Sequence, residues 1–329
     1  MRTEGLNQRL LDVKRIRTHI QTLLGDVKAV DGVDFSVHKG EAFGIAGESG
    51  CGKTMLALSI MRLFPPFTQF KLQGEAWFKG VDLLKCSKKE LQDVWGNRIS
   101  MIFQEPMTSL NPTLTIGTQI TEIIVRHENL DFSAAERRTL ELLDLVKISS
   151  PERMLKQYPH QLSGGMRQRI MIAIALACKP EILFADEPTT ALDVTIQAQI
   201  LELIKTLQEQ VGTSTILITH NLGVIAEFTR RVMVMYLGKV VESGSVFDLF
   251  DRPAHPYTQA LLNAVPKMGM RSKGGKKRLE EIKGSIPNPL NMPPGCKFHP
   301  RCPKAKETCR EKEPVLQEIE KDHSVRCWI

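Results

Sequence analysis

A glycine-rich stretch with a lysine and a hydroxyl residue at its end lies near the start of the chain. It consists of Gly47, Glu48, Ser49, Gly50, Cys51, Gly52, Lys53 and Thr54. Glycines let backbone N–H groups close around phosphate oxygens, and a helix N-terminus adds partial positive charge there. In such a loop Lys53 can reach the β- and γ-phosphates, and the Thr54 hydroxyl can ligate Mg²⁺. An apolar run at 42–46 and a helix-like run at 55–61 flank the stretch, and this context predicts a nucleotide site.

A pair of acids at the end of an apolar run is the second group that could act on phosphates. Residues 182–185 are Ile-Leu-Phe-Ala, and Asp186 and Glu187 follow them. A buried strand would deliver Asp186 to the Mg²⁺, directly or through water. Glu187 would then polarise an attacking water. With a phosphate loop upstream, this arrangement predicts hydrolysis rather than a strand that merely ends in solvated acids.

Composition sets broad limits on the protein. The chain has 329 residues, which suits about two domains, and an ordinary apolar content of 42%. The net charge of +7 fits a nucleic acid, an anionic membrane surface or simple solubility, and much of it lies in 267–283, which we interpret as a solvated linker. No apolar run approaches the length of a membrane span, and the charged N-terminus has no signal-peptide core. We therefore expect a cytoplasmic protein.

The elements that must position these residues alternate along the chain. Strands are predicted within 10–46 and at 74–81, 99–103, 182–185, 215–219, 231–235 and 239–241. Helices are predicted within 117–148, with a capping box at Ser133–Glu136, and at 166–178 and 194–209. This alternation favours an α/β fold with a parallel core. Beyond residue 250 prolines become frequent, which indicates a separate, loop-rich module.

A short Ser-Gly-Gly sequence before the 166–178 helix identifies the kind of ATPase. Ser163, Gly164 and Gly165 would make another phosphate cradle at a helix N-terminus, and in this position they resemble the signature of ATP-binding cassette (ABC) ATPases. Three further motifs of that family follow its order: Gln104 matches the Q-loop, Ala191–Asp193 the D-loop and His220 the switch histidine. The resemblance covers about 8–250. It implies a nucleotide-binding domain at 1–250, with an ABC-type P-loop ATPase core, an antiparallel β-subdomain and a helical subdomain inserted at about 105–165.

The resemblance also implies how such a site works. Two domains stack head to tail, and ATP lies between the phosphate loop of one and the Ser-Gly-Gly of the other. Gln104 would sense the γ-phosphate or its metal, and His220 would contact the γ-phosphate and hold Glu187 and the water. The family usually stacks an aromatic side chain on adenine, but Ile20 stands there, beside His19. Cys51 replaces a small hydroxyl residue, and its thiol is expected to oxidise easily.

The tail at 251–329 narrows the family. Residues 255–258, 261–266, 294–303 and 325–328, together with 104–112 after the Q-loop, resemble the ATP-binding subunits of oligopeptide and dipeptide importers. That family implies two transmembrane permease subunits and a second, identical or related ATPase subunit. It also implies an extracytoplasmic solute-binding protein and a place at the cytoplasmic face of the inner membrane.

Four cysteines crowd this tail at Cys296, Cys302, Cys309 and Cys327. Clustered cysteines in a cytosolic protein indicate a metal site more than disulfides. Four thiolates can hold a [4Fe–4S] cluster or one zinc ion, and zinc ribbons favour two close knuckles that are missing here. The resemblance implies a [4Fe–4S] cluster in some relatives, so we favour the cluster over zinc or free thiols. Its expected role is to staple a segment too small for its own core.

Other functions remain open at this stage. A transporter of the same subfamily could import nickel or another small solute. A cassette protein acting on nucleic acid would use the basic 267–283 stretch, but the chain has one cassette, no coiled-coil insertion and a coupling-type segment at 106–112. A purely regulatory ATP-binding module conflicts with the presence of both Glu187 and His220. We therefore expect an ATPase that works with no nucleic acid.

Overall fold

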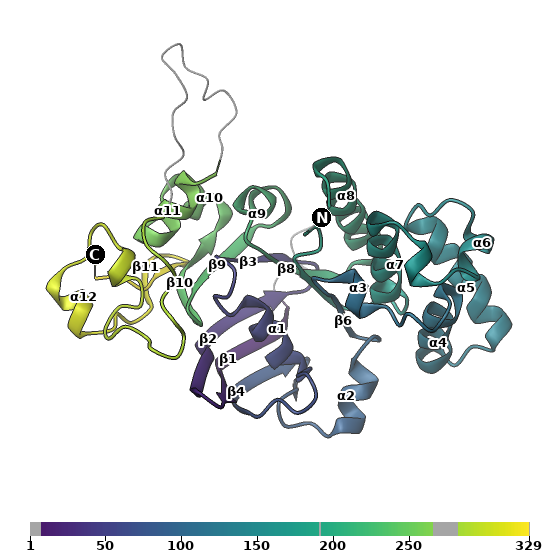
Figure 1. Cartoon of the computed structure of the whole chain (residues 1–329), viewed down its shortest axis with the longest axis horizontal. Coiled ribbons are helices and arrows are strands. Elements are labelled where there is room, and N and C mark those ends of the chain that lie inside the picture. Colours follow the sequence, from purple (N-terminus) through teal and green to yellow (C-terminus); the bar gives the residue numbers. More distant parts are fainter. Residues whose placement is uncertain (1–7, 191, 266–281, 329) are drawn as a thin grey trace, which may run out of the picture. The chain divides into compact units, whose positions relative to one another are not determined.

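The computed structural model describes residues 8–190, 192–265 and 282–328 (Figure 1). Most of the basic stretch predicted to be a linker, 267–283, lies outside the described residues. The chain forms two compact units. The helix-rich unit contains His38–Glu41 and Lys85–Leu217, and the strand-rich unit contains Leu10–Val37, Ala42–Leu84 and Ile218–Ile329. Among the described residues, every helix is too short or too polar to cross a bilayer.

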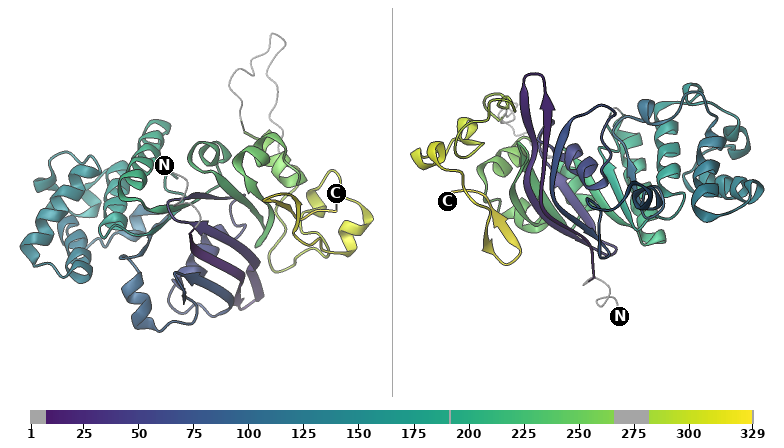
Figure 2. Two further views of the ribbon diagram at one scale, coloured as in Figure 1. Left: turned by 180° about the vertical axis from the view of Figure 1, so that it is seen from behind. Right: turned by 90° about the horizontal axis from the view of Figure 1, so that it is seen from below.

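An antiparallel sheet occupies the N-terminal part of the strand-rich unit, and its strands run side by side in both views of Figure 2. In sheet order the strands are β2 (Gly25–His38), β1 (Arg9–Thr22), β4 (Phe70–Phe78) and β5 (Val81–Asp82). Leu11 and Val13 of β1 are buried, and after a register shift the buried residues are Ile16 and Thr18. The bulge at this register shift therefore keeps one face of β1 buried along the strand.

The strand-rich unit contains a second set of paired strands, and one of them, β3 (Ala42–Ala46), directly precedes the phosphate loop. In sheet order these are β11 (Gln317–Glu320), β12 (His323–Val325), β10 (Lys239–Ser245), β9 (Arg231–Tyr236) and β3 (Ala42–Ala46). β3 and β9 are parallel, whereas β12 pairs with β10 in antiparallel fashion. The helices of this unit are α1 (Lys53–Met61), α9 (Leu222–Phe228), α10 (Val246–Asp251), α11 (Pro256–Asn263) and α12 (Glu307–Glu311). The tail thus adds strands to the β3–β9–β10 set, while a domain boundary at residue 250 stays a prediction.

The helix-rich unit carries three parallel-core strands with a cluster of helices. Its strands are β6 (Ile99–Ile102), β7 (Ile182–Asp186) and, as far as Leu217, β8 (Ser214–Thr219), in the order β8-β7-β6. Its helices are α2 (Lys88–Val94), α3 (Pro106–Ser109), α4 (Ile116–Glu128), α5 (Phe132–Leu145), α6 (Pro151–Leu155), α7 (Gly164–Leu176) and α8 (Val194–Val211). Every residue of β6 and β7 is buried, as parallel strands covered on both faces require. The predicted helical insert is present as α3 to α6, while its bounds of about 105–165 stay a prediction.

The predicted capping box at Ser133–Glu136 is wrong by two residues. Asp131 caps α5 instead, because its Oδ1 accepts a hydrogen bond of 2.7 Å from the N–H of Ala134. Ser133 lies inside the first turn, where its hydroxyl accepts from Arg137. Asp is as good a helix cap as Ser, so the earlier residue starts the helix.

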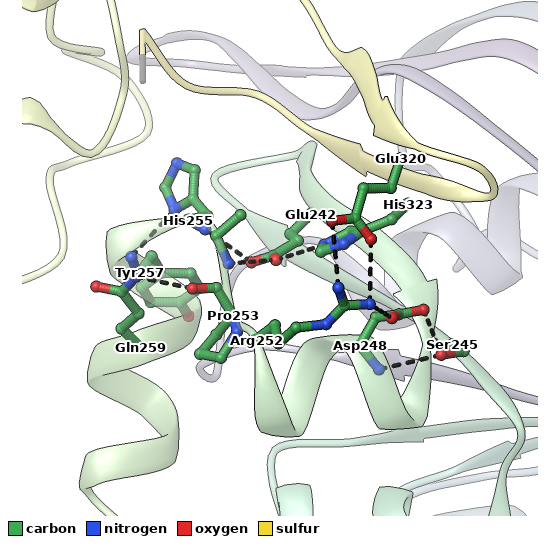
Figure 3. A network of polar contacts seen from close by, with 11 residues as sticks. Glu242, Ser245, Asp248, Arg252, Pro253, His255, Tyr257, Gln259, Glu320 and His323 are labelled. Carbon is green, nitrogen blue, oxygen red and sulfur yellow. Dashed lines mark hydrogen bonds and ion pairs between the residues drawn. The ribbon is translucent and has the colours of Figure 1, made fainter.

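A buried carboxylate organises the start of the C-terminal region (Figure 3). Glu242 of β10 is fully buried and accepts three hydrogen bonds, from the N–H groups of Ala254 (2.7 Å) and His255 (3.0 Å) and from Nε2 of His323 (2.9 Å). A buried charge is tolerated only when its oxygens are satisfied in this way. Glu242 therefore ties β10 to β12 and to the segment that enters α11.

His255 makes the stability of this region depend on pH. Burial lowers the pKa of His255 from 6.5 to about 4, and its Nδ1 accepts a 3.0 Å bond from the N–H of Tyr257. Between pH 6.5 and pH 4, His255 binds a proton in the unfolded chain but stays neutral in the native protein. The free energy of unfolding therefore decreases as the pH falls. The loss should reach about 3 kcal/mol near pH 4. Denaturant melts at pH 7 and pH 4.5 should show it, and His255→Gln, which keeps an acceptor, should lower that pH dependence. An unchanged pH dependence in His255→Gln contradicts this assignment.

Candidate nucleotide site and cysteine centre

The phosphate loop lies between β3 and α1 in the strand-rich unit. Lys53 is the first residue of α1 and is only 5% exposed. Its Nζ donates to the carbonyl oxygens of Gly47 (2.8 Å) and Glu48 (3.0 Å). The lysine is thus held across the loop at the N-terminus of a helix, where an anion is favoured.

Two glycines allow the loop to turn this tightly. Gly47 and Gly52 have φ values of +149° and +102°. A Cβ on Gly47 would lie 2.4 Å from the carbonyl oxygen of Met235, and one on Gly52 would lie 2.2 Å from that of Ala29. Any larger residue would therefore displace backbone as well as strain its own φ.

Cys51 does not behave as expected from the sequence. Its side chain is 2% exposed, and burial raises the pKa of the thiol. A buried thiol with a raised pKa is inert, because the thiolate is the reactive form. The prediction of an easily oxidised cysteine in the loop is therefore wrong.

The two acids lie at the end of β7 in the helix-rich unit. Asp186 and Glu187 are 1% and 7% exposed. Glu187 has a left-handed φ of 44°, which is uncommon for a residue with a side chain, and its Oε2 accepts a 2.8 Å hydrogen bond from Oγ1 of Thr190. Strained residues cluster at active sites, so this geometry suits a residue placed for chemistry.

Gln104 leaves the sheet beside these acids. Ile102, at the end of β6, lies opposite Ala185 of the parallel strand β7. Gln104 follows two residues later and is exposed. Because the carboxyl ends of neighbouring parallel strands meet at one edge, the structure brings Gln104 and the acids to the same edge of this unit.

The signature and D-loop residues are exposed helix caps. Ser163 caps α7, and its Oγ accepts from the N–H of Met166 at 3.3 Å. Gly164 is exposed and Gly165 half-buried. Asp193 caps α8 through a 3.0 Å bond from the N–H of Ile196 and is exposed, whereas Ala191 lies outside the described residues. Both N-termini are therefore accessible to a partner.

His220 follows β8 directly and is exposed. It belongs to the strand-rich unit, as do the phosphate loop and Ile20, whereas Gln104, Asp186, Glu187, Ser163 and Asp193 belong to the helix-rich unit. Each unit thus carries one coherent part of the predicted machinery.

The predicted adenine contact, Ile20, has an aromatic neighbour. Ile20 lies near the end of β1, half-buried, opposite Phe70 of β4. Phe70 is 39% exposed, and its ring stacks on that of Phe64 with centroids 3.7 Å apart. Side chains directly opposite on antiparallel strands share a face. Sequence reasoning missed this aromatic because strand register alone places it there.

The four C-terminal cysteines line a single cavity of about 100 Å³. Burial raises the pKa of Cys296, Cys302 and Cys327, that of Cys327 to about 11, and the neighbouring thiols raise them further. The shared cavity brings the four thiols together. Burial and the neighbouring thiols thus disfavour the thiolate forms of these cysteines. A bound metal cation would favour the thiolate forms, because metals bind the deprotonated thiol.

The spacing of the thiols bears on which metal fits. Among the described residues, one group of three or more His, Cys, Asp or Glu has its ligand atoms within 4.8 Å of one another, namely Asp248, Glu320 and His323. No three of the four cysteines form a group this tight in the described part of the chain. In the group of Asp248, Glu320 and His323, the guanidinium of Arg252 bonds to Asp248 (2.6 Å) and Glu320 (3.1 Å). An arginine therefore occupies the place that a metal ion would take.

Comparison with known proteins places these features in one family. Residues 30–190 match the ABC transporter family model, and residues 241–309 match the model of the oligopeptide/dipeptide transporter C-terminal region. The chain is 54% identical over 319 residues to the probable peptide ABC transporter ATP-binding protein y4tR of Sinorhizobium fredii, covering 97% of this chain and 94% of the relative. It is 50% identical over 320 residues to the oligopeptide transport ATP-binding protein AppD of Bacillus subtilis, covering 97% and 96%. The chain belongs to the ATP-binding subunits of the oligopeptide/dipeptide ABC transporter family.

As an ABC ATPase, the chain hydrolyses ATP to drive transport. Its fold matches that of the ATP-binding cassette MJ0796, whose dimer was solved in a post-hydrolysis state with ADP and phosphate. The TM-score is 0.64 at 27% identity, over 72% of this chain and 98% of that one. The predicted cassette fold, with its antiparallel β-subdomain and helical insert, is therefore confirmed.

Two residues of this ABC ATPase escaped the sequence analysis. Tyr257 and Arg301 both bond to Glu48 of the phosphate loop, although 209 and 253 residues separate them from it. Neither contact leaves a signal in a single sequence, because no local pattern links a loop to a partner so far along the chain.

Proposed function

We propose that this chain powers the uptake of dipeptides or oligopeptides by hydrolysing ATP beneath a membrane importer. The observation that carries the proposal is the combination of a complete set of cassette motifs with an importer-type C-terminal region over residues 241–309. The names of the relatives, which refer to peptide, oligopeptide and dipeptide transport, support peptides as the solute.

Residues of the phosphate loop, together with Asp186 and Gln104, would bind the phosphates and Mg²⁺. The backbone N–H groups of Gly47 to Thr54 bind the phosphates, and Lys53 adds the charge at the β- and γ-phosphates. The Thr54 hydroxyl, Asp186 and Gln104 would hold Mg²⁺, which offsets the charge of the phosphates. Oxygen donors of this kind are what Mg²⁺ prefers, so the residues fit the ion.

The hydrolytic step falls to the residues at the strand ends. Glu187 orients and deprotonates water, and His220 holds Glu187 and contacts the γ-phosphate. Ile20, with Phe70 nearby, contacts adenine through apolar surface. Burial of Glu187 at 7% exposure supports its role, because a buried side chain is held in one orientation by its neighbours.

A second cassette completes each site in this proposal. The nucleotide held by the phosphate loop of one subunit would face the signature and D-loop residues of the other, namely Ser163, Gly164, Gly165 and Asp193. The exposure of Ser163, Gly164 and Asp193 at the N-termini of α7 and α8 supports this, as does the dimeric state named for MJ0796. The second subunit is a copy of this chain or a related ATPase.

The remaining partners follow from the same family. Two transmembrane permease subunits receive the ATPase pair at the cytoplasmic face of the inner membrane, near 106–112. An extracytoplasmic binding protein delivers the solute. No nucleic acid takes part. Import of nickel or another small solute is the alternative within the subfamily.

We further propose that Cys296, Cys302, Cys309 and Cys327 hold a [4Fe–4S] cluster, with zinc as the alternative. The four thiols line one cavity, which supports a shared metal site there. Its role is structural, since it would staple a region that lacks a large apolar core.

Co-purification tests the assembly. The tagged chain should be recovered from detergent-solubilised membranes with two integral membrane subunits, and peptide-loaded binding protein should stimulate ATP hydrolysis by the complex. Recovery of the chain without membrane subunits, but with salt-sensitive DNA binding, contradicts the proposal and favours the nucleic-acid alternative.

A further inference from the structure

Glu48, the second residue of the phosphate loop, is bound to the C-terminal region by two side chains. Nη1 and Nη2 of Arg301 donate to its two carboxylate oxygens at 2.7 and 3.0 Å. The backbone N–H of Glu48 donates to the hydroxyl of Tyr257 at 2.9 Å. The carbonyl oxygen of Glu48 in turn accepts from Nζ of Lys53 at 3.0 Å. One loop residue thus joins the C-terminal region to the phosphate-binding lysine.

The ion pair is shielded from water on the arginine side. The side chain of Arg301 is 3% exposed and that of Glu48 is 24% exposed. The hydrogen bonds to Glu48 raise the pKa of Arg301 further above its usual range, so the guanidinium stays charged. Two parallel charge-assisted bonds fix the direction of the carboxylate. Removal of one partner leaves the other charge partly buried and unsatisfied, which is costly.

An aromatic cluster holds both partners of Glu48 in place. The ring of Tyr257 lies 4.7 Å from that of Tyr236 and 5.2 Å from that of Phe298, measured between centroids. The guanidinium of Arg301 lies 5.9 Å from the centroid of the Tyr236 ring. Tyr257 is fully buried at the start of α11, two residues beyond His255 in the network of Figure 3. Side chains packed in this way keep single rotamers, as a positioning group requires.

Two of the four cysteines flank, in the sequence, the turn that carries Arg301. Arg301 ends the short 3₁₀ helix His299–Arg301, between Cys296 and Cys302. The N–H of His299 donates to the carbonyl of Cys296 at 3.0 Å. The position of Arg301 therefore depends on the same segment that shapes the cysteine cavity.

We propose that Arg301 and Tyr257 are positioning residues for nucleotide binding, acting through Glu48. They hold the phosphate loop and Lys53 in the geometry that receives the phosphates, so the C-terminal region braces the ATP site of its own chain. The proposal rests on the proposed phosphate-binding role of residues 47–54.

The test measures the affinity of the full chain for Mg-ADP by titration calorimetry. Arg301→Met and Glu48→Gln should each weaken binding on the order of tenfold, since each leaves a charged or polar partner unsatisfied. The double variant should bind no more weakly than either single one, because both remove the same interaction. In the assembled complex Arg301→Met should raise the KM for ATP with kcat nearly unchanged, as expected when only binding is affected.

Three further variants separate the possible outcomes. Arg326 is a matched control, because its guanidinium donates to the carbonyls of Val240 and Pro314 and neither bond reaches the loop. Arg326→Met should therefore keep normal affinity. Tyr257→Phe removes one hydroxyl, keeps the packing and should weaken binding several-fold. Lys53→Ala should lose most nucleotide binding, and normal binding by that variant would disprove the phosphate-loop assignment itself.

The proposal is overturned if Lys53→Ala loses binding while folded Glu48→Gln and Tyr257→Phe bind as the wild type does. It is also overturned if Arg326→Met weakens binding as much as Arg301→Met does, or if the effects of Arg301→Met and Glu48→Gln simply add.

Discussion

Replacing Glu187 by Gln should lower ATP hydrolysis by about 10²- to 10⁴-fold, which is the usual contribution of a general base. The amide keeps the size of the side chain and can still accept from Oγ1 of Thr190, as the carboxylate does at 2.8 Å. It no longer takes a proton from water. Phosphate binding by Lys53 is untouched, so ATP should bind and remain unhydrolysed.

The same variant should remain as an ATP-bound pair of cassettes, visible as a stable dimer by size-exclusion chromatography. Glu181→Gln is the matched control. Glu181 lies just before β7 and pairs with Arg98 at 3.1 Å, with 31% and 37% of the side chains exposed. Such a pair contributes little, so hydrolysis should be unaffected. Unchanged turnover in Glu187→Gln is the result that contradicts the assigned base.

Protein purified without oxygen should contain about four irons and four acid-labile sulfides per chain, as a [4Fe–4S] cluster requires. Cys302→Ser should lose most of both, because the remaining three thiols do not complete the ligand set. Cys178→Ser is the control, since Cys178 lies on neither the cavity wall nor the C-terminal region.

One zinc per chain with no sulfide contradicts the cluster but remains consistent with a structural metal ion bound by the four cysteines. Absence of both metals contradicts any metal role of the four thiols. Neither result affects the ATPase assignment, which depends on separate residues.

Much of the fold follows from local patterns in the sequence. The buried strand that ends at Asp186 was predicted, because an apolar run acts over a few residues. The helix after Ser163 was predicted at 166–178 and lies at Gly164–Leu176, two residues earlier at both ends. The loop motif is similarly local. These features therefore identify the cassette before any coordinates are considered.

The rest depends on contacts that a single sequence does not encode visibly. β11 has every residue exposed, so it lacks the apolar alternation that marks a strand. β10 runs to Ser245 because β9 pairs with it as far as that residue. The salt bridge between Glu48 and Arg301 joins residues that are 253 positions apart. Burial of Cys51 depends on the packing of the loop, which reverses the reactivity expected from its neighbours. Tertiary packing decides all of these features.

The most direct test of the central claim is uptake of a labelled tripeptide by cells that carry either the wild-type chain or Glu187→Gln at the native locus. We predict uptake with the wild type and its near-complete loss with Glu187→Gln, with nickel uptake equal in both strains. Peptide uptake that persists in Glu187→Gln while nickel uptake fails would contradict the peptide assignment and favour import of a small solute.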